Sequence, residues 1–142
     1  MANTGYLLMN LSKQMKYQLN QSLIQKGVTV QQWAVIQHLS HGEKQTATEL
    51  SLALDMDKPT ISGIIQRLEK KEIIEKNKSP NDSRSYLLSL TKLGVSKLKE
   101  CQQLSDQILE DYLAVLTSEE QDALNLLLSK IDQENQKKAK EM

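Results

Sequence analysis

The side chains with the clearest binding chemistry lie in one short stretch, residues 58–71. Isoleucines and a leucine recur there at helical spacing, as Ile61, Ile64, Ile65 and Leu68, and predict one inward-facing stripe. The opposite face keeps polar, cationic and small residues, namely Lys58, Thr60, Ser62, Gly63, Gln66, Arg67 and Lys70. Hydroxyl and amide groups can read base edges in the DNA major groove, and a glycine permits close approach. The stretch predicts a DNA-binding helix, with an ordinary solvated helix face as the alternative.

A second polar group follows in the segment 79–85, which is dense in turn-forming residues. The segment lies between two β-favouring stretches, 73–78 and 86–91, and the three together predict a hairpin with a polar tip. Arg84 in that tip is suited to the narrow, negative minor groove of A·T-rich DNA. Asp82 is placed to hold Arg84 in an extended pose by a charge-assisted hydrogen bond. A solvated arginine at a loop tip is the alternative.

Helix starts are marked where a threonine precedes a Glu or Gln by three residues, at Thr29, Thr46 and Thr117. Asp57 is predicted to cap the helix that contains the isoleucine stripe. The order of elements is then two helices, a short helix, an amphipathic helix, a hairpin and two long helices, the first of them resuming beyond Gly94. This order predicts a mainly α fold with a small β-hairpin wing, in which the short helix and the amphipathic helix form a helix-turn-helix pair.

The net charge of zero over 142 residues hides an uneven distribution. Residues 56–100 hold ten Lys and Arg against six Asp and Glu, whereas residues 101–142 hold four against nine. A basic middle fits a nucleic-acid partner better than the net charge does.

Several classes of protein are not indicated. No apolar run approaches the roughly 20 residues of a membrane span, and the N-terminus lacks the pattern of a signal peptide. The single cysteine fits a cytoplasmic protein. No phosphate loop, nucleophile elbow or cysteine–histidine pattern suggests an enzyme, and no cofactor is expected.

Three segments together resemble the MarR family (multiple antibiotic resistance regulators). Residues 57–71 resemble that family's recognition helix, residues 80–84 its wing, and residues 88–94 the LTxxG motif that follows the wing. The resemblance covers nearly the whole chain in element order and is strongest from residue 46 to residue 95. It implies a dimeric transcriptional regulator in which each subunit presents a winged helix to half of a pseudo-palindrome.

Two positions depart from the family pattern. Ser83 stands where the family commonly has Arg, which removes one phosphate or structural contact from the wing. Glu72 stands where the family commonly has Gly, so the recognition helix is expected to end without a left-handed glycine. Because Asp82 and Arg84 are both present, the prediction of DNA binding stands.

The resemblance divides a single compact domain into a winged helix-turn-helix region, residues 29–91, and a helical dimerisation region, residues 1–28 and 92–142. Apolar residues in the terminal helices exceed what a small winged helix can cover, so a second subunit is expected to bury them. They are Leu7, Leu8, Leu11, Leu109, Leu113, Leu116, Leu124, Leu127, Leu128 and Ile131. An intramolecular helical bundle is the alternative.

Many MarR relatives sense a small molecule between these two regions. The corresponding crevice would be lined here by Met9, Ser12, Met15, Lys16, Trp33, Ile36 and Gln37. Apolar walls with a few polar groups suit an aromatic or amphipathic effector, and plain core packing is the alternative.

Two further groups invite chemistry without a supporting motif. Cys101 falls on an apolar stripe and is predicted to be a core residue and not a redox sensor. His38 and His41 have a spacing that can bring two imidazoles to one metal, with Glu43 as a conceivable further ligand. A structural or solvated histidine pair is expected, and no metal.

The sequence therefore predicts a cytoplasmic homodimer that binds pseudo-palindromic double-stranded DNA and regulates transcription. It is expected to act as a repressor that a small-molecule effector releases. A winged-helix module for protein–protein interaction, without DNA binding, is the alternative.

Overall fold

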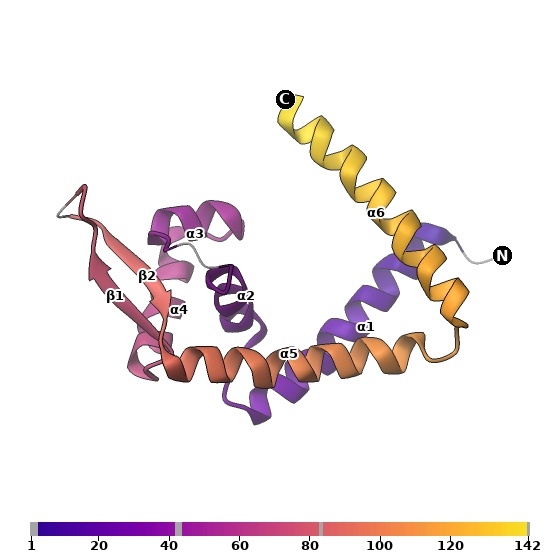
Figure 1. The fold of residues 1–142 in the computed structure, drawn as a ribbon, viewed down its shortest axis with the longest axis horizontal. Coiled ribbons are helices and arrows are strands. Elements are labelled where there is room, and N and C mark those ends of the chain that lie inside the picture. The colour runs from indigo at the N-terminus through magenta and orange to yellow at the C-terminus, as the bar shows by residue number, and fades with distance from the viewer. Residues whose placement is uncertain (1–2, 42–43, 83, 142) are drawn as a thin grey trace. The chain divides into compact units, whose positions relative to one another are not determined.

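The structure, a computed structural model, describes residues 3–41, 44–82 and 84–141. Along the chain it contains α1 (Thr4–Gln25), α2 (Val30–Leu39), α3 (Ala47–Ala53), α4 (Lys58–Lys70), β1 (Ile74–Lys78), β2 (Tyr86–Leu90), α5 (Lys92–Leu113) and α6 (Ser118–Glu141) (Figure 1). The order of helices and strands is the predicted one, and the fold is mainly α with a hairpin wing. None of the helices in the described ranges is both long and apolar enough to cross a membrane.

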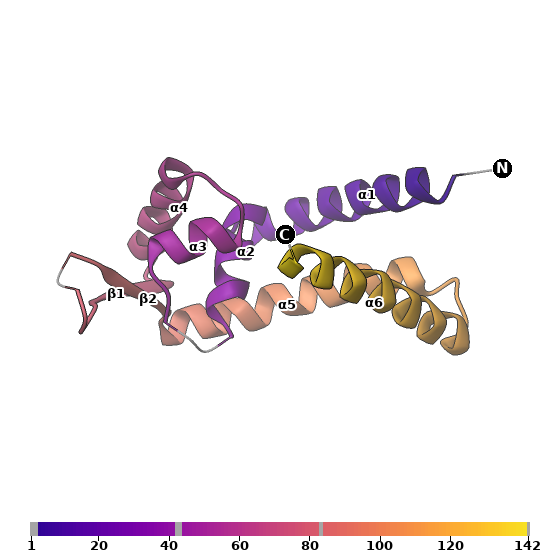
Figure 2. The ribbon, with the colours of Figure 1, turned by 90° about the horizontal axis from the view of Figure 1, so that it is seen from above.

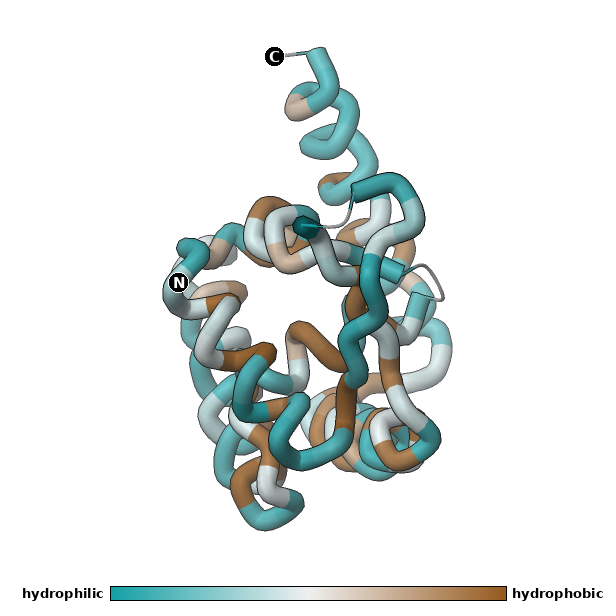
Figure 3. The backbone as a smooth tube through the Cα atoms, turned by 90° about the vertical axis from the view of Figure 1, so that its left-hand side faces the viewer, coloured by the Kyte–Doolittle hydropathy of each residue, from teal (hydrophilic) through white to brown (hydrophobic). Residues whose placement is uncertain are grey.

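The chain divides into two compact units, Met1–Asp106 and Gln107–Met142. The first unit holds α1 to α4, the hairpin and most of α5, and it contains the apolar core. The second unit holds the end of α5 and all of α6, whose last turns are almost wholly hydrophilic (Figure 3).

Helices α2 and α3 start where the sequence predicts, because local side chains satisfy free amides of each first turn. Thr29 with Gln32, and Thr46 with Glu49, form reciprocal capping boxes at α2 and α3. The same exchange at the start of α6 joins Thr117 to Glu120, at 2.9 and 3.2 Å. Each of these three predictions is confirmed.

The core gathers on the inward stripe of α4. Ile61, Ile64, Ile65 and Leu68 are each at most 3% exposed. They belong to one buried cluster with Leu50 of α3, Trp33 and Ile36 of α2, Leu88 of β2 and Cys101 of α5. The isoleucine spacing predicted this packing correctly.

Strand β2 of the hairpin is hydrogen-bonded on both of its sides. β1 and β2 pair antiparallel, with Ile74 opposite Leu90 and Lys78 opposite Tyr86. On the other side of β2, Gln45 exchanges two backbone hydrogen bonds with Leu88, at 3.3 and 2.7 Å. The wing is thereby tied to the residues that lead into α3, and the ribbon shows the hairpin beside α3 and α4 (Figure 2).

A compact junction joins α4, the hairpin and α5. The Thr91 hydroxyl donates to the carbonyl oxygen of Glu72 at 2.6 Å and accepts from the Gly94 amide at 3.0 Å. The Gly94 amide is thus satisfied within the first turn of α5, which begins at Lys92 and not beyond Gly94 as the sequence suggested. Glu72 itself adopts φ 63°, so the left-handed turn that usually carries a glycine is kept with another residue in its place.

Gly94 has no room for a side chain, and we expect Gly94→Ala to destabilise the fold. A Cβ at this position would collide with the carbonyl oxygen of Ile73, and overpacking of this kind costs about 1–3 kcal/mol. Gly63→Ala is the matched control, because nothing lies within 4 Å of its Cβ position and alanine favours a helix by roughly 1 kcal/mol. Chemical denaturation of both variants measures the difference, and equal stabilities would contradict the junction as described.

Candidate nucleic-acid interface

The outward face of α4 carries the residues that the sequence selected. Lys58, Ser62, Gln66, Arg67 and Lys70 are exposed, and Thr60 and Gly63 are half-buried. Burial of the isoleucine stripe leaves these groups as one polar, cationic helix face. In the part of the chain that the structure describes, nothing outside the local helix backbone lies within 4 Å of the Cβ position of Gly63, so packing there does not require a glycine.

The N-terminus of α4 is fixed by Asp57. Its carboxylate accepts a hydrogen bond from the Thr60 amide at 2.7 Å, and Pro59 occupies the first turn, where no amide donor is needed. Hydrogen bonds from Thr60 hold the pKa of the Asp57 carboxyl below its usual range. The helix therefore starts at a defined residue, which sets where Lys58, Ser62 and Gln66 lie along the face.

The tip of the wing is organised by Asp82. Its carboxylate accepts hydrogen bonds from the Arg84 amide at 3.0 Å and from the Ser85 hydroxyl at 3.3 Å. The predicted link between Asp82 and Arg84 thus runs through the backbone, and the ion pairs found among the described residues include none with the Arg84 guanidinium. Ser83, one of the departures from the family, lies outside the described residues.

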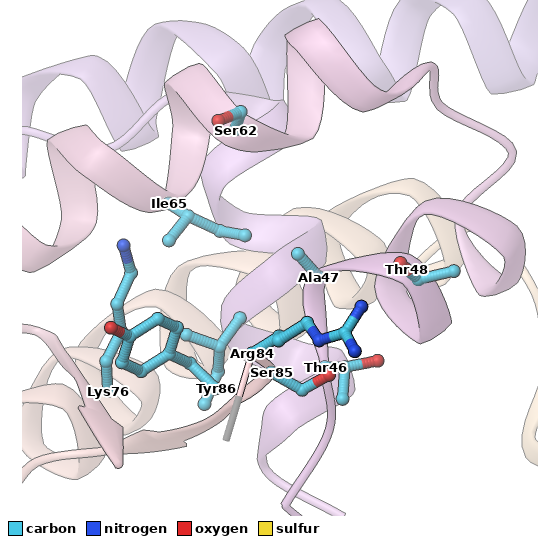
Figure 4. A pocket seen from close by; sticks show the side chains of 10 residues that line it. Thr46, Ala47, Thr48, Ser62, Ile65, Lys76, Arg84, Ser85 and Tyr86 are labelled. Atoms are coloured by element: carbon cyan, nitrogen blue, oxygen red, sulfur yellow. The ribbon is translucent and has the colours of Figure 1, made fainter. Parts of the chain in front are cut away.

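A hollow of about 220 Å³ separates the wing from the helix-turn-helix pair (Figure 4). Its polar walls come from α3 and the residue before it, from α4 and from the wing, and include Thr46, Thr48, Ser62, Lys76, Arg84 and Tyr86. In Figure 4 the Arg84 side chain extends toward Thr46 and Thr48. Ser62 and Arg84, both predicted to bind DNA, therefore border one site although 22 positions separate them in the sequence.

Sequence reasoning missed Lys76 and Tyr86. The Lys76 ammonium lies 3.6 Å from a carboxylate oxygen of Glu69 and 5.7 Å from the centroid of the Tyr86 ring. A lysine within a short strand is common, and only the strand register places this one opposite Leu88 at the edge of the hollow.

The residues of the predicted effector crevice are spread over different environments. Trp33 and Ile36 are buried in the core, Met15 and Gln37 are half-buried, and Met9, Ser12 and Lys16 are exposed. The hollow beside the wing shares no residue with this set.

The other candidate groups offer little chemistry. Burial raises the pKa of the Cys101 thiol, an effect that nearby Lys97 offsets only in part, so the reactive thiolate is disfavoured. His38 and His41 meet edge to face with ring centroids 6.5 Å apart. No cluster of three metal-ligating side chains occurs in the described ranges, and Glu43 lies outside them.

A short helix, a tight turn, a second helix with a cationic face and a hairpin beside it define a winged helix-turn-helix protein. A sequence model of the MarR family matches residues 26–85. The multiple antibiotic resistance protein MarR of Escherichia coli is 30% identical over 128 residues, which are 89% of each chain. The chain belongs to the MarR family of transcriptional regulators.

Further relatives agree with this assignment. A putative transcriptional regulatory protein for the hcr operon of Thauera aromatica is 29% identical over 106 residues, 75% of this chain and 64% of that one. The wild-type apo MarR structure from Escherichia coli superimposes with a TM-score of 0.84 at 27% identity, over 92% of this chain and 97% of that one. A MepR–DNA complex from Staphylococcus aureus shares the fold, with a TM-score of 0.76 at 24% identity, over 94% and 99%.

The Asp57 cap predicts a pH dependence of folding. A carboxyl whose pKa is lowered in the folded state stabilises the fold above its unfolded pKa, here the ordinary 3.8, and loses that contribution as the pH falls through the lowered folded value. Asp57→Asn keeps an amide-binding cap without a titrating group. We therefore expect the stability difference between wild type and Asp57→Asn to be constant above pH 5 and to change in favour of the variant below pH 4. Thermal unfolding from pH 7 to pH 2.5 tests this, and parallel curves throughout would rule out the proposed linkage.

Proposed function

We propose that the chain is a dimeric, sequence-specific DNA-binding repressor of transcription that a small-molecule effector releases. The observation that carries the proposal is the outward face of α4, where cationic and hydrogen-bonding side chains lie opposite a fully buried stripe. Membership of a family of transcriptional regulators and the shared fold of a MepR–DNA complex support it.

In the proposed complex, α4 enters the major groove and the wing reaches the flanking minor groove. Thr60, Ser62 and Gln66 are the side chains suited to base edges, and Gly63 lets the helix axis approach the base pairs closely. Lys58, Arg67 and Lys70 are suited to phosphates, with Lys58 at the positive N-terminus of the helix. Asp82 fixes the backbone from which Arg84 projects.

A dimer is supported by apolar residues that each unit leaves uncovered. In the first unit, Leu7, Leu8 and Leu11 of α1 are exposed. In the second, Leu109, Leu127, Leu128 and Ile131 are exposed, while Leu113, Leu116 and Leu124 are half-buried. Together these are all the residues of the predicted dimerisation surface, and two-fold pairing would bury such leucines against one another. We propose residues 1–28 and 92–142 as this dimerisation region, with residues 29–91 as the DNA-binding region.

The effector site remains a proposal that rests on the family. Of the predicted lining residues, Met9, Ser12, Met15, Lys16 and Gln37 keep accessible surface that a ligand could contact. Trp33 and Ile36 are so deeply buried that a ligand would have to displace core packing to reach them. We further propose that the chain acts in the cytoplasm and catalyses no reaction.

Fluorescence anisotropy with purified protein tests the function directly. An operator selected from a random duplex library is titrated at two salt concentrations beside an unrelated duplex of equal length, while light scattering measures the oligomer. We expect tight, salt-dependent, selective binding by a species of twice the 16.1 kDa chain mass. Equal weak binding of both duplexes by a monomer would favour the interaction-module alternative.

Removing the wing arginine isolates the contribution of the hairpin. Arg84→Ala is expected to weaken operator binding by roughly 1–3 kcal/mol, the usual scale for a specific base contact, and to relax preference at the flanking positions. Lys13→Ala on α1 serves as the control, because Lys13 is exposed and is neither a residue of the proposed DNA interface nor one of the apolar residues of the proposed dimerisation surface. Unchanged operator affinity of a folded Arg84→Ala variant would remove the wing from the interface.

A further inference from the structure

The hollow between α3, α4 and the wing has the chemistry of an anion site. Its walls carry two cations, Lys76 and Arg84, and none of the described residues that line it is acidic. The hydroxyl groups of Thr48, Ser62 and Tyr86 add donors from three different elements. Positive charge without a lining carboxylate, on a concave surface, favours an oxyanion such as phosphate.

Lys76 is held at this site by two weak interactions. Its ammonium lies 3.6 Å from Glu69 in a pair whose side chains are 35% and 40% exposed, and 5.7 Å from the centre of the Tyr86 ring. Exposed ion pairs of this kind contribute little to stability, so an incoming phosphate can replace Glu69 at small cost. The two contacts keep the long lysine side chain near the hollow before any ligand arrives, which reduces the entropy that binding would otherwise cost.

We infer that the hollow seats one phosphate of the DNA backbone and that Lys76 is the cation that binds it. The inference rests on the proposed DNA-binding function, since the hollow is bordered by Ser62 of the recognition face and by Arg84 of the wing. A backbone between major-groove and minor-groove contacts must pass between these two residues. Arg84 supplies a second positive charge at the edge of the hollow, whereas Lys76 is not among the side chains proposed to contact bases.

A phosphate contact and a base contact have different signatures in binding experiments. Lys76→Gln is expected to weaken binding to the selected operator and to an unrelated duplex by the same factor. It should also reduce, by about one, the slope of the logarithm of the binding constant against the logarithm of salt concentration. Arg84→Ala instead changes preference at the flanking positions. Lys92→Gln is the matched control, because Lys92 is an exposed lysine close in sequence to the wing that does not line the hollow.

Methylphosphonate scanning of one operator half-site identifies the phosphate itself. Each methylphosphonate linkage removes one negative charge from the DNA backbone. We expect one linkage to lower the operator affinity of the wild-type protein and of the control variant, Lys92→Gln. The same linkage should not change the affinity of Lys76→Gln. The variant's thermal unfolding is checked in parallel, so that a folding defect is not read as a lost contact. If wild type binds the operator and no linkage is coupled to Lys76, the inference is overturned while the proposed function stands. If wild type binds no duplex, both fail.

A free anion is the other source of the same chemistry. Thermal unfolding of wild type and Lys76→Gln in inorganic phosphate, against chloride at equal ionic strength, separates the two sources. Stabilisation by phosphate that depends on Lys76, with no coupled DNA linkage, would assign the hollow to a small anion and would overturn the assignment to the DNA backbone.

Discussion

Burial of one apolar stripe on α4 is the interaction on which the rest of the first unit depends. Fully burying an isoleucine or leucine side chain contributes roughly 1.5–3 kcal/mol, and Ile61, Ile64, Ile65 and Leu68 are all essentially inaccessible. Lys58, Ser62 and Gln66 lie on the opposite face of α4, so burial of the stripe turns these side chains toward solvent. The sequence pattern that holds the fold together is therefore the one that presents the cationic face.

Hydrogen bonds place the wing relative to that helix. The Ile73 amide donates to Leu68 of α4 at 2.9 Å, and Thr91 donates through its backbone to Ile73 at 3.0 Å. The bridge from Gln45 to Leu88 ties the other edge of β2 to the start of α3. These bonds close a loop through α3, α4 and the hairpin, so the hollow between them has walls of defined spacing.

The parts of the fold that the sequence predicted are those decided within a few residues. A capping box involves residues three apart, such as Thr46 and Glu49, and an amphipathic stripe repeats every three or four positions, so both are visible in the chain itself. The true start of α5 was missed because Thr91 caps it while bonding Glu72, 19 residues earlier.

Only part of the candidate site was predicted, because only part of it is decided by residues close together in the sequence. The outward face of α4 follows from one helix, and that face was found. The hollow needs Thr48, Ser62 and Lys76, whose proximity depends on β1, β2 and the bridge to Gln45. Local patterns also suggested that Asp82 and Arg84 interact. In the structure the Asp82 carboxylate accepts a hydrogen bond from the backbone amide of Arg84, and not from its guanidinium as the sequence suggested.

Two positions show where the fold and the proposed interface make different demands on the backbone. Glu72 sits at φ 63°, a conformation that costs a non-glycine residue roughly 1–2 kcal/mol, and the junction with Thr91 holds it there. Gly63 is the reverse case, a glycine in mid-helix that costs roughly 1 kcal/mol relative to alanine although its surroundings have space for a Cβ. Among the described residues, nothing lies within 4 Å of that Cβ position, so packing within the chain gives no reason for the glycine. The proposed function gives one, because it brings a second surface close to the axis of α4. A base pair in the major groove is such a surface, and Gly63 lies between Ser62 and Gln66 on the face that would meet it.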